Sequence, residues 1–209
     1  MLFRSPVMGL ELARDKFETL RLLKSAGLPV PETELVRDLD QLEAAVERVG
    51  GAPVVIKPLH GSQGQGTILA ESAAGAVSMM QSVLFQSREF LIQRYIPCAG
   101  EDIRVIVVNG EVVAAMRRKA PEGDFRSNLA RGGSAAHEEV TAELGQLAVA
   151  ATETLGLRCS GVDLLPGASG PVLLEVNGSP GLGGIEEATG MDVATSWIMA
   201  LEKGVADST

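Results

Sequence analysis

Gly161-Val162-Asp163-Leu164-Leu165 and Val172-Leu173-Leu174-Glu175-Val176-Asn177 are the two runs that decide the fold of this chain. The turn-forming segment 166–170 separates them, so the sequence predicts a β-hairpin with a loose loop. Side chains two residues apart on a strand share a face, which puts Glu175 beside Asn177, and the first strand brings Asp163 alongside. Two carboxylates and an amide oxygen suit Mg²⁺ or Mn²⁺ carrying a substrate phosphate, not zinc. The alternative is that these residues are ordinary turn formers and solvated polar groups.

The composition describes an acidic chain with enough apolar residues for one domain or two small lobes. It has 209 residues, 45% of them hydrophobic, and a formal net charge of −9, which disfavours a general nucleic-acid surface. No apolar run approaches the roughly 20 residues that span a bilayer. Cys98 and Cys159 have neither metal-site nor disulfide-scaffold spacing and indicate a reducing compartment. We therefore expect a soluble cytoplasmic protein without membrane or direct nucleic-acid partners.

The first half of the chain contains a lysine followed by a glycine-rich loop. Helical periodicity predicts one helix from Gly9 to Gly27 and a second, capped by Asp38, that closes at Gly50. A β-branched strand at 53–58 then precedes the glycine-rich loop, and an extended run follows at 68–70. Glycine lets backbone N–H groups approach phosphate oxygens, and a lysine adds a point charge. The spacing is neither that of a P-loop nor that of a Rossmann fingerprint, so a mobile hairpin loop remains the alternative.

From residue 73 onward the sequence predicts both helices and strands. A helix at 73–86 and a strand at 89–96 precede two apolar runs, 102–108 and 111–117, joined by Asn109-Gly110, a strong hairpin signal. The polar, arginine-containing segment 120–134 has the length and composition of a functional loop. The remaining expectations are a helix from His137 to Gly156, the hairpin quoted above, a glycine-rich turn to Gly184 and a final helix at 192–202.

The order of these pieces resembles the ATP-grasp ligases. The motifs are Ala-Arg-Asp-Lys at 13–16, Val-Val-Ile-Lys-Pro at 54–58, Gln-Arg-Tyr-Ile at 93–96, Asp-Ile-Arg at 102–104, Gly-Asp-Phe-Arg-Ser-Asn at 123–128 and Glu-Val-Asn-Gly-Ser-Pro-Gly at 175–181. Within this superfamily the chain looks most like the RimK type, which joins glutamate to a protein or peptide carboxyl end. The resemblance implies an α+β fold, two lobes whose antiparallel sheets enclose a nucleotide cleft. It divides the ATP-grasp domain 1–209 into a lid subdomain, 28–95, and a core subdomain, 1–27 with 96–209.

The resemblance also implies a role for each matching residue. ATP phosphates would be held by Lys16 and Lys57 and covered by Gly61, Ser62, Gln63, Gly64 and Gly66. Adenine would face the linker residues Gln93, Arg94, Tyr95 and Ile96, with Asp102 on the ribose. The transferred phosphoryl group and the reacting carboxylate would face Arg118, Arg126 and Asn128, and the nucleotide would also contact Ser127. Two divalent ions, Mg²⁺ or Mn²⁺, would be bound by Asp163, Glu175 and Asn177.

The implied reaction is ATP-dependent amide formation through an acyl phosphate, with L-glutamate or a similar amino acid joined to the C-terminal carboxylate of a protein or peptide. Phosphoryl transfer to a carboxylate needs mainly positioning and charge neutralisation, which Lys, Arg and metal ions provide. Two alternatives remain open. One is a ligase of a small biosynthetic acid or a coenzyme tail, and the other is a nucleotide-binding module without turnover.

The chain departs from the family pattern in two places. Arg94 stands where such ligases usually have Glu before the aromatic residue of the linker. In addition, the family normally has a further domain ahead of the Arg-Asp-Lys helix. We expect either that this domain lies outside the present sequence or that a neighbour in a homo-oligomer completes the substrate side of the cleft.

Overall fold

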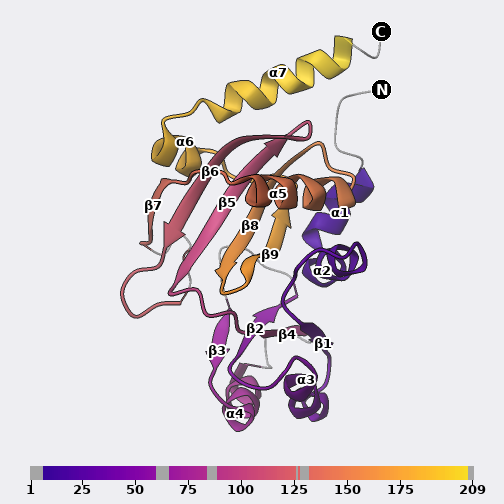
Figure 1. Ribbon diagram of the computed structural model, residues 1–209. Helices are drawn as coiled ribbons and strands as arrows, with labels where there is room; N and C mark the ends of the chain where they lie inside the picture. The colour runs from indigo at the N-terminus through magenta and orange to yellow at the C-terminus, as the bar shows by residue number, and fades with distance from the viewer. Residues whose placement is uncertain (1–6, 60–65, 84–88, 126, 128–131, 207–209) are drawn as a thin grey trace.

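The computed structural model describes residues 7–59, 66–83, 89–125, 127 and 132–206. They form an α+β fold with two lobes, each built on its own antiparallel sheet (Figure 1). The smaller lobe contains α3, α4 and β1 to β4, and the larger lobe contains the other labelled elements. Among the described residues, no helix combines the length and the apolar character needed to cross a bilayer.

The sheet of the smaller lobe has the strand order β1-β4-β2-β3. Its strands are β1 (Thr33–Val36), β2 (Val54–Pro58), β3 (Ile68–Ala70) and β4 (Phe90–Arg94). Alternation on β2 and β4 directs Val54, Ile56 and Ile92 into a core cluster beneath α3 (Leu42–Arg48) and α4 (Ala73–Val83). The opposite face of the sheet, which carries Val55, Lys57 and Gln93, therefore lines the space between the lobes.

The sheet of the larger lobe has the strand order β7-β6-β5-β8-β9. Its strands are β5 (Glu101–Val108), β6 (Glu111–Lys119), β7 (Ser134–His137), β8 (Cys159–Gly167) and β9 (Gly170–Asn177). The predicted hairpin at Asn109-Gly110 is confirmed. Both residues have positive φ, 50° and 77°, the backbone that a tight two-residue turn between twisted strands requires.

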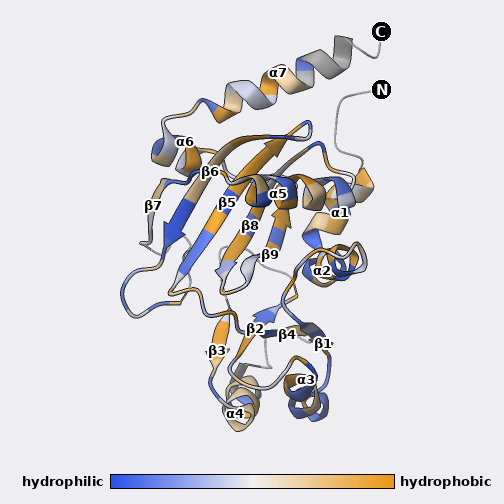
Figure 2. Cartoon of the chain, viewed as in Figure 1, coloured by the Kyte–Doolittle hydropathy of each residue, from blue (hydrophilic) through white to orange (hydrophobic). Residues whose placement is uncertain are grey.

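Helices cover both faces of the larger sheet. On one face, α5 (Ala142–Thr154) packs over the strands, and Leu23 of α2 (Lys16–Ser25) joins the same core cluster; α1 (Val7–Arg14) lies beside α2. On the other face, α6 (Gly183–Thr189) and α7 (Val193–Ala206) contribute Ile185, Val193 and Ala200 to a separate cluster. Figure 2 shows that β5 and β6 are hydrophobic along most of their length and hydrophilic at the end nearer the smaller lobe. This polar end borders the site described below.

Two predictions about helix starts differ from the structure, and side-chain capping explains the first of them. The expected helix 9–27 is broken at Asp15, whose side chain leaves the helix and accepts hydrogen bonds from the N–H groups of Phe17 and Glu18. Asp38 precedes a short 3₁₀ helix, η1 (Leu39–Gln41), and makes no side-chain capping bond. The periodic apolar pattern is continuous through Asp15, so periodicity alone does not reveal the break there.

Three elements in the second half of the chain differ from the expectation. Residues Ser134–His137, expected to be loop and helix start, form β7 on the edge of the sheet, and α5 begins after the cap residue Thr141. The loop of the 161–177 hairpin is tighter than predicted, because β8 and β9 stay paired as far as Gly167 and Gly170. Finally, α6 occupies part of the segment expected to be a turn.

Candidate functional site

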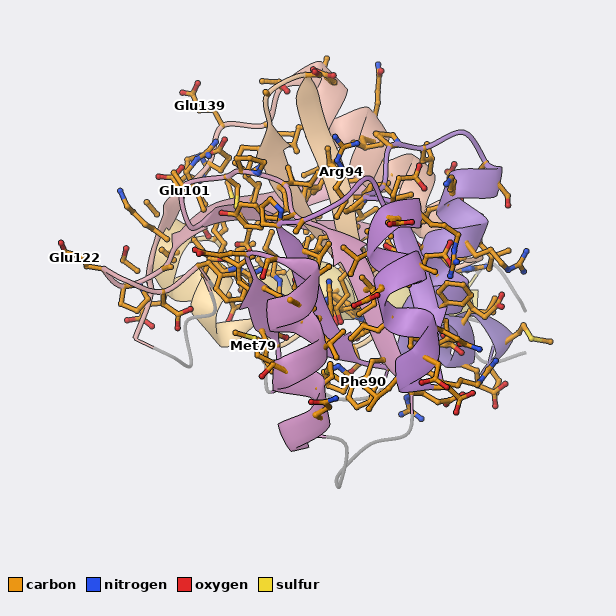
Figure 3. The ribbon with its side chains drawn as sticks, turned by 90° about the horizontal axis from the view of Figure 1, so that it is seen from below. Met79, Phe90, Arg94, Glu101, Glu122 and Glu139 are labelled. Carbon is orange, nitrogen blue, oxygen red and sulfur yellow. The ribbon has the colours of Figure 1, made fainter. Side chains whose placement is uncertain are left out.

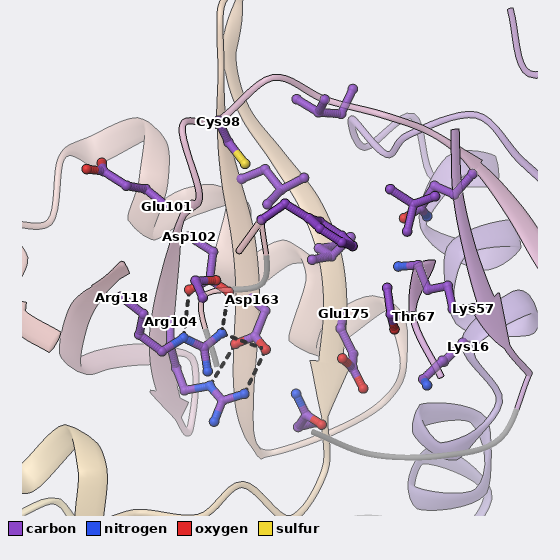
Figure 4. A pocket seen from close by; sticks show the side chains of 18 of the residues that line it. Lys16, Lys57, Thr67, Cys98, Glu101, Asp102, Arg104, Arg118, Asp163 and Glu175 are labelled. Carbon is purple, nitrogen blue, oxygen red and sulfur yellow. Dashed lines mark hydrogen bonds and ion pairs between the residues drawn. The ribbon is translucent and has the colours of Figure 1, made fainter. Parts of the chain in front are cut away.

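A cavity of about 610 Å³ lies between the two lobes. Its lining residues come from the inner face of the smaller sheet, from the polar ends of β5, β6, β8 and β9, from the start of α2 and from the turn before α6 (Figure 4). Gly161 on β8 allows this turn to pack closely, since a Cβ there would lie 2.7 Å from Pro180 Cβ. The strand order therefore gathers charged side chains that are far apart in sequence.

Two arginines and two aspartates form a paired network on the larger-lobe side of the cavity (Figure 4). Arg118 donates from Nε and Nη2 to the two carboxylate oxygens of Asp102, both at 2.6 Å. Arg104 donates in the same two-pronged way to Asp163, both at 2.7 Å. Nη2 of Arg118 also lies 3.1 Å from Oδ2 of Asp163, which joins the two pairs. This geometry is the fork-to-carboxylate pairing that arginine favours.

The pKa directions of the two aspartates differ because their numbers of arginine partners differ. Burial raises the pKa of Asp102, and Arg118 only partly offsets it. Burial also acts to raise the pKa of Asp163, but Arg104 and Arg118 together outweigh it and the pKa is lowered. The pKa of Arg118 is raised, because the two aspartates outweigh the opposing effect of its own burial. The network is therefore charge-compensated within the protein.

Glu175 and Asn177 contrast with that network. Within the described part of the chain, the Glu175 carboxylate accepts no hydrogen bond and makes no ion pair, although it faces Asp163 across the hairpin. Burial and the Asp163 charge raise its pKa, and Lys16, Lys57 and Arg104 lower it in part. Nδ2 of Asn177 is buried and has no acceptor among the residues that the structure describes. Unsatisfied polar groups of this kind are costly in a closed interior and indicate a ligand between them.

The side-chain oxygens of Asp163, Glu175 and Asn177 fit a divalent cation, whereas the unpaired Nδ2 of Asn177 is a donor and suits an acceptor such as a phosphate oxygen. Asp163, Glu175 and Asn177 all line the same cavity, and the register pairs Asp163 with Glu175 and Gly161 with Asn177. A bulge after Asp163 leaves Leu174 without a cross-strand partner, so Leu174 and Glu175 both line the cavity. Carboxylate and amide oxygens without His or Cys are the donor set that Mg²⁺ prefers. The described residues contain no cluster of three His, Cys, Asp or Glu residues placed to hold a metal, so Asn177 is needed to complete this set.

Two lysines approach Glu175 from the opposite side of the cavity (Figure 4). Lys16 is the first residue of α2, directly after its cap Asp15. Lys57 lies on β2, and burial lowers its pKa to about 8, with the charge of Glu175 opposing this shift and that of Lys16 adding to it. Lysine ammonium groups act as point charges toward phosphate oxygens. Two of them on one side of the same cavity therefore suit a phosphate-bearing ligand.

The linker residues Arg94, Tyr95 and Ile96 line the cavity between the lobes. Arg94 N–H donates to Glu32 O at 2.8 Å and Tyr95 N–H to Pro53 O at 3.3 Å. Ile96 N–H has no hydrogen-bond partner among the described residues. The Arg94 guanidinium lies over Gly50, where an added Cβ would be 3.7 Å from its Cζ, and Figure 3 shows Arg94 from the side of the smaller lobe. The side chain that departs from the family pattern is thus held beside a glycine of the smaller lobe.

Several predicted site residues lie outside the described part of the chain. These are Gly61, Ser62, Gln63 and Gly64 of the glycine-rich loop, together with Arg126 and Asn128. Gly66, the last of the predicted loop residues, is described and would place a Cβ 3.3 Å from Pro58. Ser127 is buried and lines the cavity. Glu122 is exposed and points outward (Figure 3).

Arg104 is a site residue that the sequence-based prediction misses. It belongs to the Asp-Ile-Arg motif, for which the resemblance supplies a role only at Asp102. Alternation from Asp102 places Arg104 on the cavity face of β5, and it is the cross-strand partner of Asp163. The alternation is visible in the sequence, whereas the pairing of β5 with β8 is not.

Residues 13–201 match the family described as the RimK-like ATP-grasp domain. The chain belongs to this family. Among its curated relatives are two proteins named as probable alpha-L-glutamate ligases. The protein from Nitrosococcus oceani is 46% identical over 200 residues, covering 95% of this chain and 66% of the relative. That from Halorhodospira halophila is 47% identical over 196 residues, covering 93% and 65%. The chain thus spans just under two thirds of the length of these relatives.

Solved structures of other ATP-grasp proteins share the fold. The ATP-grasp ligase PsnB complexed with minimal precursor superposes with a TM-score of 0.75 at 27% identity, covering 96% of this chain and 63% of PsnB. D-cycloserine synthetase DcsG gives a TM-score of 0.79 at 22% identity, covering 95% and 72%, a likeness of fold alone. The α+β ATP-grasp architecture expected of this family is therefore confirmed.

Proposed function

We propose that this RimK-like ATP-grasp chain is the catalytic part of an ATP-dependent ligase that forms an amide bond between a carboxylate and an amine. The observation that supports it best is Glu175, a half-buried carboxylate that accepts no hydrogen bond from the described residues and lies between two lysines and a paired arginine–aspartate network. A cavity that brings such a carboxylate together with lysines suits a metal–nucleotide ligand. The division into a lid, 28–95, and a core, 1–27 with 96–209, is part of this proposal.

Each group of cavity residues would have a separate task. Lys16 and Lys57 would bind phosphate oxygens, and Gln93 to Ile96 would receive the base, with Asp102 near the ribose. Arg104 and Arg118 would neutralise charge that develops on the transferred phosphoryl group. Arg126, Ser127 and Asn128 would position the reacting carboxylate, and residues 61–66 would exclude water from the product of the first step.

The reaction would proceed in two steps. A carboxylate oxygen attacks the γ-phosphorus of ATP, the bond to ADP breaks, and an acyl phosphate forms. The uncharged amine of the second substrate then attacks the acyl carbon, phosphate leaves, and the amine loses its extra proton as the amide forms. Fixed cations and accurate positioning supply most of the rate acceleration in such transfers.

Asp163, Glu175 and Asn177 would hold the divalent ion that accompanies the nucleotide. The ion would supply charge neutralisation at the phosphate oxygens, while Arg104 keeps the Asp163 carboxylate in place. PsnB has been solved in complex with Mg and ADP, which supports Mg²⁺ for this fold. A second ion and the use of Mn²⁺ are parts of the proposal that rest on the donor set alone.

The proposed substrates are L-glutamate, or a similar amino acid, and the C-terminal carboxylate of a protein or peptide. The support comes from the relatives named as probable alpha-L-glutamate ligases and from PsnB, whose complex contains a minimal precursor. Segment 120–134 borders the cavity through Phe125 and Ser127 and would contact the acceptor. Action in the cytoplasm and assembly as a homo-oligomer remain predictions.

The test measures phosphate release from ATP with Mg²⁺ and glutamate, with and without peptide acceptors, together with product masses. We expect release that depends on acceptor and products that increase by one glutamyl residue. Glu175→Ala with Asn177→Ala should abolish release, whereas Glu139→Ala, at an exposed position pointing away from the molecule (Figure 3), should not. Products from a small acid but not from peptides would favour the alternative acceptor class. ATP binding without release under all conditions would contradict a ligase.

A further inference from the structure

Three residues, Thr33, Gln93 and Val55, form a row across the inner face of the smaller sheet. Thr33 of β1 and Val55 of β2 are both cross-strand partners of Gln93 on β4. Residues directly opposite on neighbouring strands project to the same side. Val55 and Gln93 line the cavity, whereas Thr33 is not among its lining residues. Thr33 is therefore placed behind Gln93 and can act on a ligand only through it.

The hydrogen bonds along this row run in one direction. Thr33 Oγ1 donates to Pro31 O at 2.9 Å, and a carbonyl oxygen can only accept. The single hydroxyl proton is thus used, so Thr33 Oγ1 must act as acceptor toward Gln93, whose Nε2 donates to it at 2.9 Å. The reversed amide would place two acceptors face to face or leave Pro31 O without its donor. The two hydrogen bonds, from Gln93 to Thr33 and from Thr33 to Pro31, therefore fix which end of the Gln93 amide points toward Thr33.

The oxygen end of the amide is then the end left for a ligand. Gln93 is only 2% exposed, and no described residue donates to its Oε1. Among the described residues, Asn177 Nδ2 is the one fully buried side-chain polar atom without a partner, so Gln93 Oε1 is not fully buried. Because Gln93 lines the cavity, that small exposure is to the cavity.

We propose that Thr33 is a positioning residue that sets the base preference of the nucleotide site by fixing the Gln93 amide. An oxygen acceptor at this place matches a 6-aminopurine, which offers an amino donor at position 6. A 6-oxopurine carries an oxygen at that position and would face Gln93 Oε1 with a second acceptor. This inference rests on the nucleotide site of the proposed function. It adds to that function the residue that would make the site select adenine.

The test compares Mg–ADP with Mg–IDP, whose bases differ at position 6 and in the protonation of N1. Calorimetric titrations of the wild-type chain, Thr33→Val and Thr33→Ser give the ratio of the two affinities. Valine has nearly the shape of threonine without the hydroxyl, so the Gln93 amide is free to turn. We expect the preference for ADP to fall about tenfold in Thr33→Val, the change in affinity that corresponds to one net hydrogen bond. Thr33→Ser, which keeps the hydroxyl, should retain the wild-type preference.

The readout separates positioning from a structural effect. Equal weakening of both nucleotides in Thr33→Val, or an unchanged ratio with wild-type affinity, would overturn the proposal. Loss of the preference for ADP in Thr33→Ser would also contradict the proposal, because serine keeps the hydroxyl group that accepts from Gln93. If the wild-type chain bound neither nucleotide, the proposed function would fail together with this inference. ADP binding with a ratio insensitive to Thr33 would refute this inference alone.

Discussion

The charged groups on the two sides of the cavity differ in how completely they are paired within the protein. On the larger-lobe side, Arg104, Arg118, Asp102 and Asp163 satisfy one another through two-pronged ion pairs. On the smaller-lobe side, burial lowers the pKa of Lys57 to about 8. Between the two sides, Glu175 accepts no hydrogen bond from any described residue. One side is complete without a ligand, and the other, with the Glu175 region, is not.

The difference separates stability from binding. Breaking a buried, satisfied pair leaves an uncompensated charge and destabilises the fold. Removing a group that is unsatisfied in the free protein costs the fold little, but it removes the interaction that a ligand would have supplied. Substitutions on the two sides should therefore differ most in their effect on the free energy of unfolding.

The largest effect is expected from Arg118→Met. Asp102 would be left buried with neither of its carboxylate oxygens paired to Arg118. We expect the free energy of unfolding at pH 7 to fall by about 3–5 kcal/mol, as for other broken buried pairs. Denaturant unfolding curves would measure it.

A matched control is available on the surface. Arg48→Met breaks the exposed pair with Glu34, whose side chains are 51% and 36% exposed, and should cost less than about 1 kcal/mol. Adding Asp102→Asn to Arg118→Met should recover part of the loss, since it removes the unpaired charge. Equal losses for Arg118→Met and Arg48→Met would show that the network adds no more than a surface pair.

Glu175→Gln should have the opposite profile. The substitution keeps the shape of the side chain but removes the carboxyl group, whose pKa is raised by burial and by Asp163. We expect the free energy of unfolding to change by less than about 1 kcal/mol, while turnover in the ligase assay falls about 10²- to 10³-fold. The Mg²⁺ concentration needed for half-maximal nucleotide binding should rise in parallel. A large loss of stability with unchanged Mg²⁺ dependence would place Glu175 in the scaffold instead.

Local features of the sequence predicted strands and candidate site residues, whereas the pairing of charged side chains depends on which strands are neighbours. The alternation of Asp163, Glu175 and Asn177 with apolar residues is local, and so is the Asn109-Gly110 turn; both led to correct strands. The pairing of Arg104 with Asp163 depends on β5 lying next to β8, 59 residues away. The bond from Gln93 to Thr33 likewise depends on β4 lying next to β1. Candidate groups were visible in the sequence, but which of them neutralise one another was set by strand order.

The pH dependence of ADP affinity tests the role of Lys57 on the smaller-lobe side of the cavity. Its pKa of about 8 means that the ammonium form is mostly lost by pH 9 in the free protein. Affinity for ADP should therefore fall up to about tenfold between pH 7 and pH 9. Lys57→Arg stays cationic over this range and should remove the dependence.

The same group has a stability signature of predictable sign. The lowered pKa means that the unfolded chain binds more protons between about pH 8 and the ordinary lysine value of 10.5. The contribution of Lys57 to the free energy of unfolding therefore rises with pH across this window. A Lys57→Met variant should lack this rise. Identical pH profiles for the wild-type chain and Lys57→Met would contradict the shift.

The smallest effect is expected at Asp15, which caps α2 directly before Lys16. Its Oδ1 accepts from the N–H groups of Phe17 and Glu18, both at 3.0 Å, and so begins α2 at Lys16. Asp15→Ala should lower the free energy of unfolding by about 1 kcal/mol, and Asp15→Asn, which keeps an acceptor, should cost much less. Because fraying of the first turn would also spread the positions of Lys16, ADP affinity should fall a few-fold in the alanine variant only. A stability loss with full ADP affinity would show that Lys16 is held by its cavity neighbours and not by the cap.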